Sequence, residues 1–175
     1  LNGSYADETP AVEKMGLIEL FNLGEAFDER KYTINTPPFK GWGPAASRKT
    51  CFDCHIQYGG HGLRQTKFRP EYGNGYIIQV YYPDAPGSNN GKAIEHITKF
   101  TQVMAAHPFL PPVDPDQIRI EWKTVTAMES GLPMQFPDGE RYELIYPEVT
   151  VPQSAFHTKP IPSNYAVRLE STLGI

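Results

Sequence analysis

The chain has no long apolar run and only two cysteines among its 175 residues. No stretch approaches the roughly 18 apolar residues that a membrane-spanning helix needs, and the mean hydropathy is -0.45. We therefore expect no membrane span. At this length a single domain can bury a core without disulfides.

Positive charge is also scarce. The sequence holds 16 lysines and arginines against 20 acidic residues, which gives a formal net charge of -4. There is no basic stripe for nucleic acid and no polybasic patch for an anionic lipid surface. The expected partners are therefore proteins or small molecules.

Both cysteines lie in the run Cys51-Phe52-Asp53-Cys54-His55. Cys-x-x-Cys-His is the attachment signature of c-type haem, in which the two sulfurs bond to the porphyrin and the histidine becomes the proximal iron ligand. On one helical turn Cys51, Cys54 and His55 occupy positions i, i+3 and i+4, so they share one side. The run predicts one covalently attached haem c, with His55 as its metal ligand.

Other interpretations of the cysteine pair account for the motif less well than haem attachment does. A thioredoxin-type dithiol follows a strand of a βαβ unit, and none is apparent before Cys51. A zinc site needs about four ligands, and no second Cys-x-x-Cys or close histidine pair supplies them. A disulfide between Cys51 and Cys54 closes too small a loop to constrain the unfolded chain and leaves His55 unexplained.

Haem attachment of this type takes place outside the cytoplasm, so we expect a periplasmic or extracellular protein. No signal peptide is visible. The polar opening stretch from Leu1 to Pro10 is typical of a mature N-terminus left after processing.

The first part of the sequence is predicted to be helical around the haem motif. Apolar residues at three- and four-residue steps favour one helix over 11–30, with Thr9 as its cap and Pro10 at its first position. We expect this helix to pack an apolar face on the core or on the haem edge. Residues 36–46 are rich in proline and glycine and should form no regular structure. Trp42 in this loop is a candidate to lie against the porphyrin, or else an ordinary packing aromatic.

The remainder is predicted to be rich in strands. Residues 75–82 and 117–126 have strand composition, and the second run alternates with Ile118, Ile120 and Trp122 on one face. A turn at 137–139 precedes an extended run over 142–151 that Pro147 should break. A short helix is predicted within 91–107, ending before Pro108. The fold class is thus α+β: one c-type haem domain over 1–175, helical over about 10–70, with a β-rich insert over about 71–160.

Several motifs together resemble a known family, and they are distributed over most of the chain. They are Phe21 with Gly24-Glu25-x-Phe27, Gly41-Trp42-Gly43-Pro44, Cys51-x-x-Cys54-His55, Asp138-Gly139-x-x-Tyr142-x-Leu144-x-x-Pro147 and the ending Leu169 to Ile175. This order resembles the first-haem part of the di-haem thiol-oxidoreductase-like proteins, relatives of the bacterial di-haem cytochrome c peroxidases. In that family Asp-Gly-x-x-Tyr-x-Leu-x-x-Pro forms a hairpin.

The sequence departs from that family in having a single Cys-x-x-Cys-His. Family members carry a second motif, so this chain resembles half of a di-haem protein. Three explanations stay open: a one-haem descendant, a half that pairs with another chain, or a portion of something longer. Because the family reaction uses both haems, the resemblance does not by itself imply peroxidase activity.

The sixth iron ligand decides what a single haem can do. A histidine or methionine there makes the protein an electron carrier, whereas an open position admits peroxide or a small gas. The candidates in the sequence are His61, His96, Met104 and His107. For each of them a surface or core role is the competing reading.

Three functions follow from these features. The first is a mono-haem electron-transfer protein or subunit, and the lone motif and the lack of a convincing acid/base pair favour it. The second is a peroxidase-type oxidoreductase working with a second haem on another chain. The third is an assembly module of a multi-haem complex. In each case the expected partners are redox proteins or other haem subunits in a hetero-oligomer.

Overall fold

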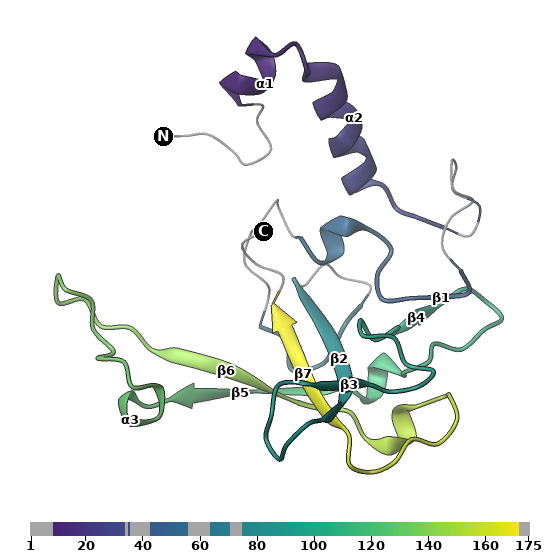
Figure 1. Ribbon diagram of the computed structural model, residues 1–175, viewed down its shortest axis with the longest axis vertical. Coiled ribbons are helices and arrows are strands. Elements are labelled where there is room, and N and C mark those ends of the chain that lie inside the picture. The colour runs from purple at the N-terminus through teal and green to yellow at the C-terminus, as the bar shows by residue number, and fades with distance from the viewer. Residues whose placement is uncertain (1–8, 34, 36–42, 56–63, 71–74, 172–175) are drawn as a thin grey trace.

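The protein combines a few helices with several small sheets. The computed structural model describes residues 9–33, 35, 43–55, 64–70 and 75–171. Two helices lie at one end and most strands at the other (Figure 1). This confirms the α+β class, and strands continue to residue 171. Within the described ranges, no helix combines the length and the apolar character needed to cross a membrane.

Two helices replace the single helix predicted over 11–30. α1 spans Pro10–Lys14 and α2 spans Ile18–Glu29. The predicted start is confirmed, because Thr9 Oγ1 accepts a hydrogen bond from the Val12 amide and Pro10 opens α1. The prediction of one helix is wrong because Gly16 has φ +68, a left-handed conformation that ends the helical path.

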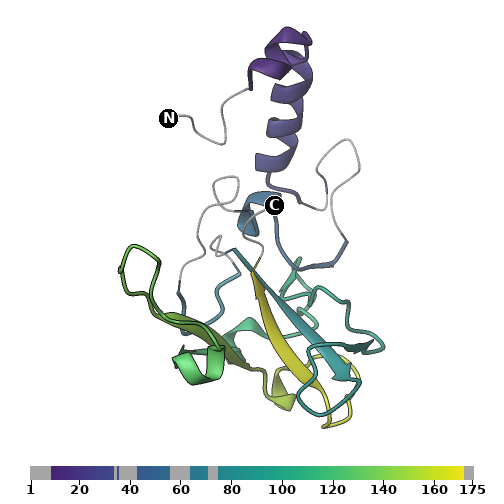
Figure 2. The same ribbon diagram turned by 60° about the vertical axis from the view of Figure 1, so that its left-hand side comes forward.

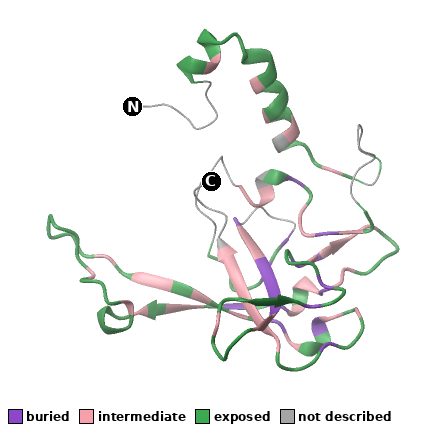
Figure 3. Cartoon of the chain, in the orientation of Figure 1, coloured by how far each residue is buried: buried purple, intermediate pink, exposed green. Residues whose placement is uncertain are grey.

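α2 does not pack on the protein core as its apolar residues suggested. It stands above the sheets (Figures 1 and 2), and its surface is largely exposed (Figure 3). Leu20 is 63% exposed and Leu23 is 54% exposed. The helix contacts the turn at residues 51–53. α2 thus stands next to the Cys-x-x-Cys-His motif with these two side chains exposed.

A three-stranded antiparallel sheet forms the centre of the β part. β2 (Tyr76–Pro83) lies between β3 (Gly91–Ala93) and β7 (Ala166–Ser171). β2 confirms the strand predicted over 75–82. Its middle residues are buried, and Val80 lies opposite Val167 in the β2–β7 register.

A two-stranded antiparallel sheet extends away from this centre. It pairs β5 (Arg119–Val125) with β6 (Leu144–Thr150), and we call this pair the β5–β6 arm. The predicted alternation is confirmed, because Ile118 and Ile120 are buried. The predicted break at Pro147 is wrong: Pro147 lies inside β6 opposite Trp122. Both strands of a two-stranded sheet are edge strands, where a missing backbone N–H is tolerated.

The helix predicted within 91–107 is wrong. The segment contains β3 and β4 (Met104–Ala105), joined by turns. Its apolar residues are buried all the same, at Ile94, Ile97 and Val103. β4 pairs with β1 (Ala45–Ala46), so the end of the loop predicted to be irregular also forms a strand. The spacing of these buried residues is that of a helical face, but the residues enter the core from successive turns.

Short elements and isolated bridges connect these sheets. They are the 3-10 turns Cys51–Asp53, Pro115–Gln117 and Gln153–Ala155, the helix α3 (Ala127–Ser130), and the bridges Lys67–Arg119, Val113–Phe156 and Gln135–Arg141. The bridge at Lys67 joins the segment that follows the motif to the start of β5.

One apolar core unites the sheets. Full burial of one valine, isoleucine or phenylalanine side chain stabilises the fold by about 1.5–3 kcal/mol relative to leaving it exposed. The core residues come from every part of the described β region: Phe68, Ile78, Val80, Ile94, Ile97, Val103, Val113, Ile118, Ile120, Val151, Ala155 and Ile161.

Gly91 allows β3 to approach β2 closely. A Cβ atom at this position would lie 1.9 Å from the Tyr82 carbonyl oxygen. We predict that Gly91→Ala lowers the free energy of unfolding by about 1–3 kcal/mol, the usual cost of overpacking. Urea denaturation followed by tryptophan fluorescence measures this change.

Gly43→Ala is the matched control, because nothing lies within 4 Å of a Cβ there. It should change the free energy of unfolding by no more than about 0.5 kcal/mol. Equal effects of the two substitutions would contradict this packing of β3 on β2.

Candidate functional site

The motif begins with a capped 3-10 turn over Cys51–Asp53. Thr50 caps it, since its Oγ1 accepts a hydrogen bond of 2.9 Å from the Asp53 amide. Asp53 Oδ2 in return accepts from the Thr50 amide at 3.1 Å and from the Lys49 amide at 3.1 Å. This reciprocal capping box satisfies amides that a turn of this kind otherwise leaves without a partner.

The turn brings the three motif residues together. The amides of Cys54 and His55 both donate to the Cys51 carbonyl oxygen, at 3.1 Å and 2.9 Å. Cys51, Cys54 and His55 therefore lie at positions i, i+3 and i+4 of one helical turn, as their spacing predicted. Cys51 is exposed, and Cys54 and His55 are half-buried. Two sulfurs and an imidazole are thus available from one short segment.

Burial and nearby charges act on Cys54. Partial burial raises the pKa of the Cys54 thiol, the positive charge of Arg48 lowers it, and the carboxylate of Asp53 raises it. Arg48 is held in place, because its guanidinium lies 4.5 Å from the Phe68 ring centroid and donates to the Tyr76 carbonyl oxygen at 2.5 Å. The motif therefore lies beside a fixed positive charge.

Backbone hydrogen bonds connect the turn to its neighbours. The Gly75 amide donates to the Asp53 carbonyl oxygen at 3.3 Å, which joins the turn to the start of β2. The Tyr32 amide donates to the Lys49 carbonyl oxygen at 2.8 Å, and the Tyr32 hydroxyl donates to the Phe27 carbonyl oxygen. The turn is thus linked to the core on one side and to the end of α2 on the other.

The other predicted site residues come from several segments of the chain. Trp42 and His61 lie outside the described residues. Met104 lies on β4 and packs against the core. His96 is at the surface, with Nε2 3.3 Å from Glu95 Oε1, and His107 is exposed.

Nor do the described parts of the chain form a cluster of metal ligands of the zinc type. Within them, no three or more His, Cys, Asp or Glu residues are placed to share a metal ion. Neither His96 nor His107 therefore joins Cys51, Cys54 and His55 in such a group.

Sequence reasoning missed three residues that support the motif. Thr50 and Asp53 form the pattern Thr-x-x-Asp, which matches the spacing of a capping box and could have been recognised. Arg48 gave no local signal. Its partners Phe68 and Tyr76 lie 20 and 28 residues away, so only the folded chain reveals its position.

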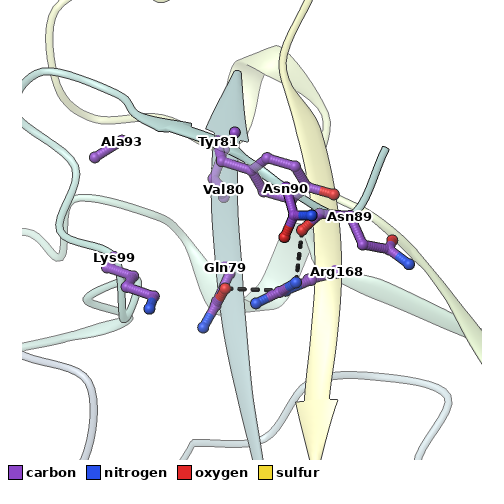
Figure 4. Close-up of a pocket in the computed structure, with 9 residues that line it drawn as sticks. Gln79, Val80, Tyr81, Asn89, Asn90, Ala93, Lys99 and Arg168 are labelled. Atoms are coloured by element: carbon purple, nitrogen blue, oxygen red, sulfur yellow. Dashed lines mark hydrogen bonds between the residues drawn. The ribbon is translucent and has the colours of Figure 1, made fainter. Parts of the chain in front are cut away.

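A cavity of about 240 Å³ lies elsewhere, on the β3–β2–β7 sheet (Figure 4). Arg168 crosses it, donating from Nε to Gln79 Oε1 at 2.9 Å and from a terminal nitrogen to the Asn89 carbonyl oxygen at 2.6 Å. Another terminal nitrogen pairs with Glu170 at 3.1 Å. Arg168 thus bonds to two of the residues that line this cavity, and none of the motif residues lines it.

Comparison with protein-family models, with curated proteins and with solved structures finds no match for this chain.

The two cysteines should differ in reactivity when the chain carries no haem. We predict that Cys51 reacts faster with iodoacetamide near pH 8, because it is exposed and because a raised pKa keeps less of Cys54 as thiolate. Peptide mass spectrometry after timed quenching measures both rates.

The difference between the two labelling rates should become smaller as the pH rises, since more of the Cys54 thiol then ionises. A Cys54→Ser variant gives the Cys51 rate alone as a control. Faster labelling of Cys54 than of Cys51 at every pH would contradict this picture of the turn.

Proposed function

We propose that this chain is a mono-haem c-type cytochrome that acts in electron transfer, as a subunit or half of a larger redox assembly. The observation that carries the proposal is the capped turn that places Cys51, Cys54 and His55 together. Cys51 and Cys54 would hold one haem c, and His55 would be its proximal ligand. When bound, the haem supplies a one-electron ferric/ferrous couple.

The residues of the turn fit a covalently held macrocycle. Two thiols and an imidazole come from a single turn, so one rigid segment can grip one group at three points. Thr50 is buried and caps the turn, which holds the backbone that carries these side chains before any group binds. A zinc ion would need a further ligand cluster, and the described residues form none.

The apolar side of α2 supports the same proposal. Leu20 and Leu23 are exposed on α2, and Leu17 is exposed directly before it. α2 contacts the motif turn. Exposed apolar area costs about 25 cal/mol per Å² relative to its burial. A large, flat, apolar group attached at the turn would give these side chains a surface to cover, in line with the predicted packing on a haem edge.

The β5–β6 arm is consistent with the hairpin of the family that the sequence resembles. Gly139 has φ +94 and its amide donates to the Phe136 carbonyl oxygen at 3.0 Å, so the turn predicted at 137–139 is present. It precedes β6, which pairs back on β5. The proposal includes a helical haem-binding part over about 10–70 and a β-rich insert over about 71–160. It also includes export to a periplasm or cell exterior, because haem attachment of this type occurs there.

Covalent haem should depend on the two cysteines. We predict that the protein, exported by a host with a haem-attachment system, keeps its haem through denaturing electrophoresis, and that Cys51→Ala with Cys54→Ala abolishes the haem stain. His55→Ala should lose the native absorption spectrum, because the iron loses its proximal ligand.

His157→Gln is the matched histidine control, because His157 is exposed and its Nδ1 bonds to the Pro111 carbonyl oxygen. It should leave both readouts unchanged. A haem-free protein from the same host, folded and exported, would overturn the proposal.

Haem should also order α2. We predict that amides of α2 exchange with solvent at least about tenfold more slowly in the haem-loaded protein than in the double cysteine variant, because the apolar side of the helix becomes covered. Hydrogen exchange with mass spectrometry measures this, with β5 as the internal reference. Equal α2 exchange in both samples would mean that the haem lies elsewhere.

A further inference from the structure

The outer end of the β5–β6 arm carries apolar side chains that the fold does not use. This tip comprises residues 126–143 and projects away from the core (Figures 1 and 2). None of its residues is buried. Met128 is 94% exposed, Leu132 is 48% exposed and Phe136 is 51% exposed. These three side chains therefore contribute nothing to the core.

The tip nevertheless has a defined conformation. Thr126 and Glu129 form a capping box on α3, and Gly131 ends the helix with φ +66. The rings of Phe136 and Tyr142 lie 4.6 Å apart, and the Phe136 amide donates to the Glu140 carbonyl oxygen at 2.8 Å. A surface held in this way loses little conformational entropy when it binds a partner.

Charge indicates which partner would fit. The tip carries four acidic residues and a single basic one, Arg141. The acidic residues are Glu129, Asp138, Glu140 and Glu143, and the first two flank Leu132 and Phe136 in sequence. The tip of a second copy of this chain would carry the same charge and be repelled, whereas a basic surface would be attracted.

We propose that this tip docks on a partner protein with an apolar patch rimmed by lysine or arginine. Exposed apolar patches with polar rims commonly mark protein interfaces, and opposite charge speeds and orients association. The inference is independent of the haem, because it rests on a part of the chain that contains none of the motif residues.

The test uses an amphipathic peptide of alternating lysine and leucine as the probe, and the same peptide with glutamate for lysine as its control. Carbon-13 labelled methionine methyl groups report binding, because Met128 lies in the tip and its side chain is exposed. We expect the lysine peptide to shift the Met128 methyl signal and the glutamate peptide to leave it unchanged. Affinity should weaken about tenfold between about 0.02 and about 0.5 M salt, as exposed charges become screened.

Three variants locate the binding site. Leu132→Ser should weaken binding of the lysine peptide about tenfold, and Glu140→Lys with Glu143→Lys should weaken it at least as much. Phe109→Ser with Leu110→Ser removes exposed apolar side chains of another loop and should have no effect. The tip lies outside the core, so circular dichroism should show all three variants folded.

Other outcomes overturn the proposal. They are the absence of binding by the lysine peptide, equal binding of the two peptides, binding that follows Phe109 and Leu110, or self-association of the chain that Leu132→Ser removes. The last result, seen by sedimentation, would assign the tip to a second copy of this chain.

Discussion

The structure depends on one shared apolar core. A two-stranded sheet is marginal in water when it stands alone, and two of the three sheets in the described regions have only two strands. They are stable together because β2, the turns after β3 and the base of the β5–β6 arm all bury side chains in the same place, among them Ile78, Ile97 and Ile120. Everything that projects from this core depends on it for its position.

The Cys-x-x-Cys-His motif is one such projection. Arg48 connects it to the core through Phe68 and Tyr76, and the Gly75 amide bonds to its last turn residue. On the far side of the motif stands α2, whose residues Leu20 and Leu23 are exposed. The core thus holds one wall of the proposed haem site firmly, and a covalently attached haem would supply the contacts that α2 lacks.

The sequence predicted elements well where a pattern was local. The strand at β2, the alternation along β5 and the cap at Thr9 follow from residues that are neighbours in the chain. The motif turn follows from the spacing of Cys51, Cys54 and His55. The α2 helix was expected as part of a longer one, because periodicity alone did not reveal that Gly16 adopts a left-handed conformation.

Errors arose where distant residues decide the structure. Ile94, Ile97 and Val103 have helical spacing, but the close approach of Gly91 to Tyr82 fixes β3, and pairing with Ala45–Ala46 fixes β4. Pro147 is a strand breaker only where its neighbour needs a hydrogen bond, and an edge strand relaxes that need. The position of Arg48 and the exposure of α2 likewise depend on residues far away in the sequence.

The ferric protein's electron paramagnetic resonance spectrum, recorded with and without hydrogen peroxide, tests the central claim most directly. An electron carrier with a filled sixth position predicts a low-spin signal that peroxide leaves unchanged, and a far-red charge-transfer band would then distinguish methionine from histidine as the ligand. A high-spin signal that peroxide converts would contradict electron transfer as the function and favour the peroxidase alternative, with the second electron coming from another haem.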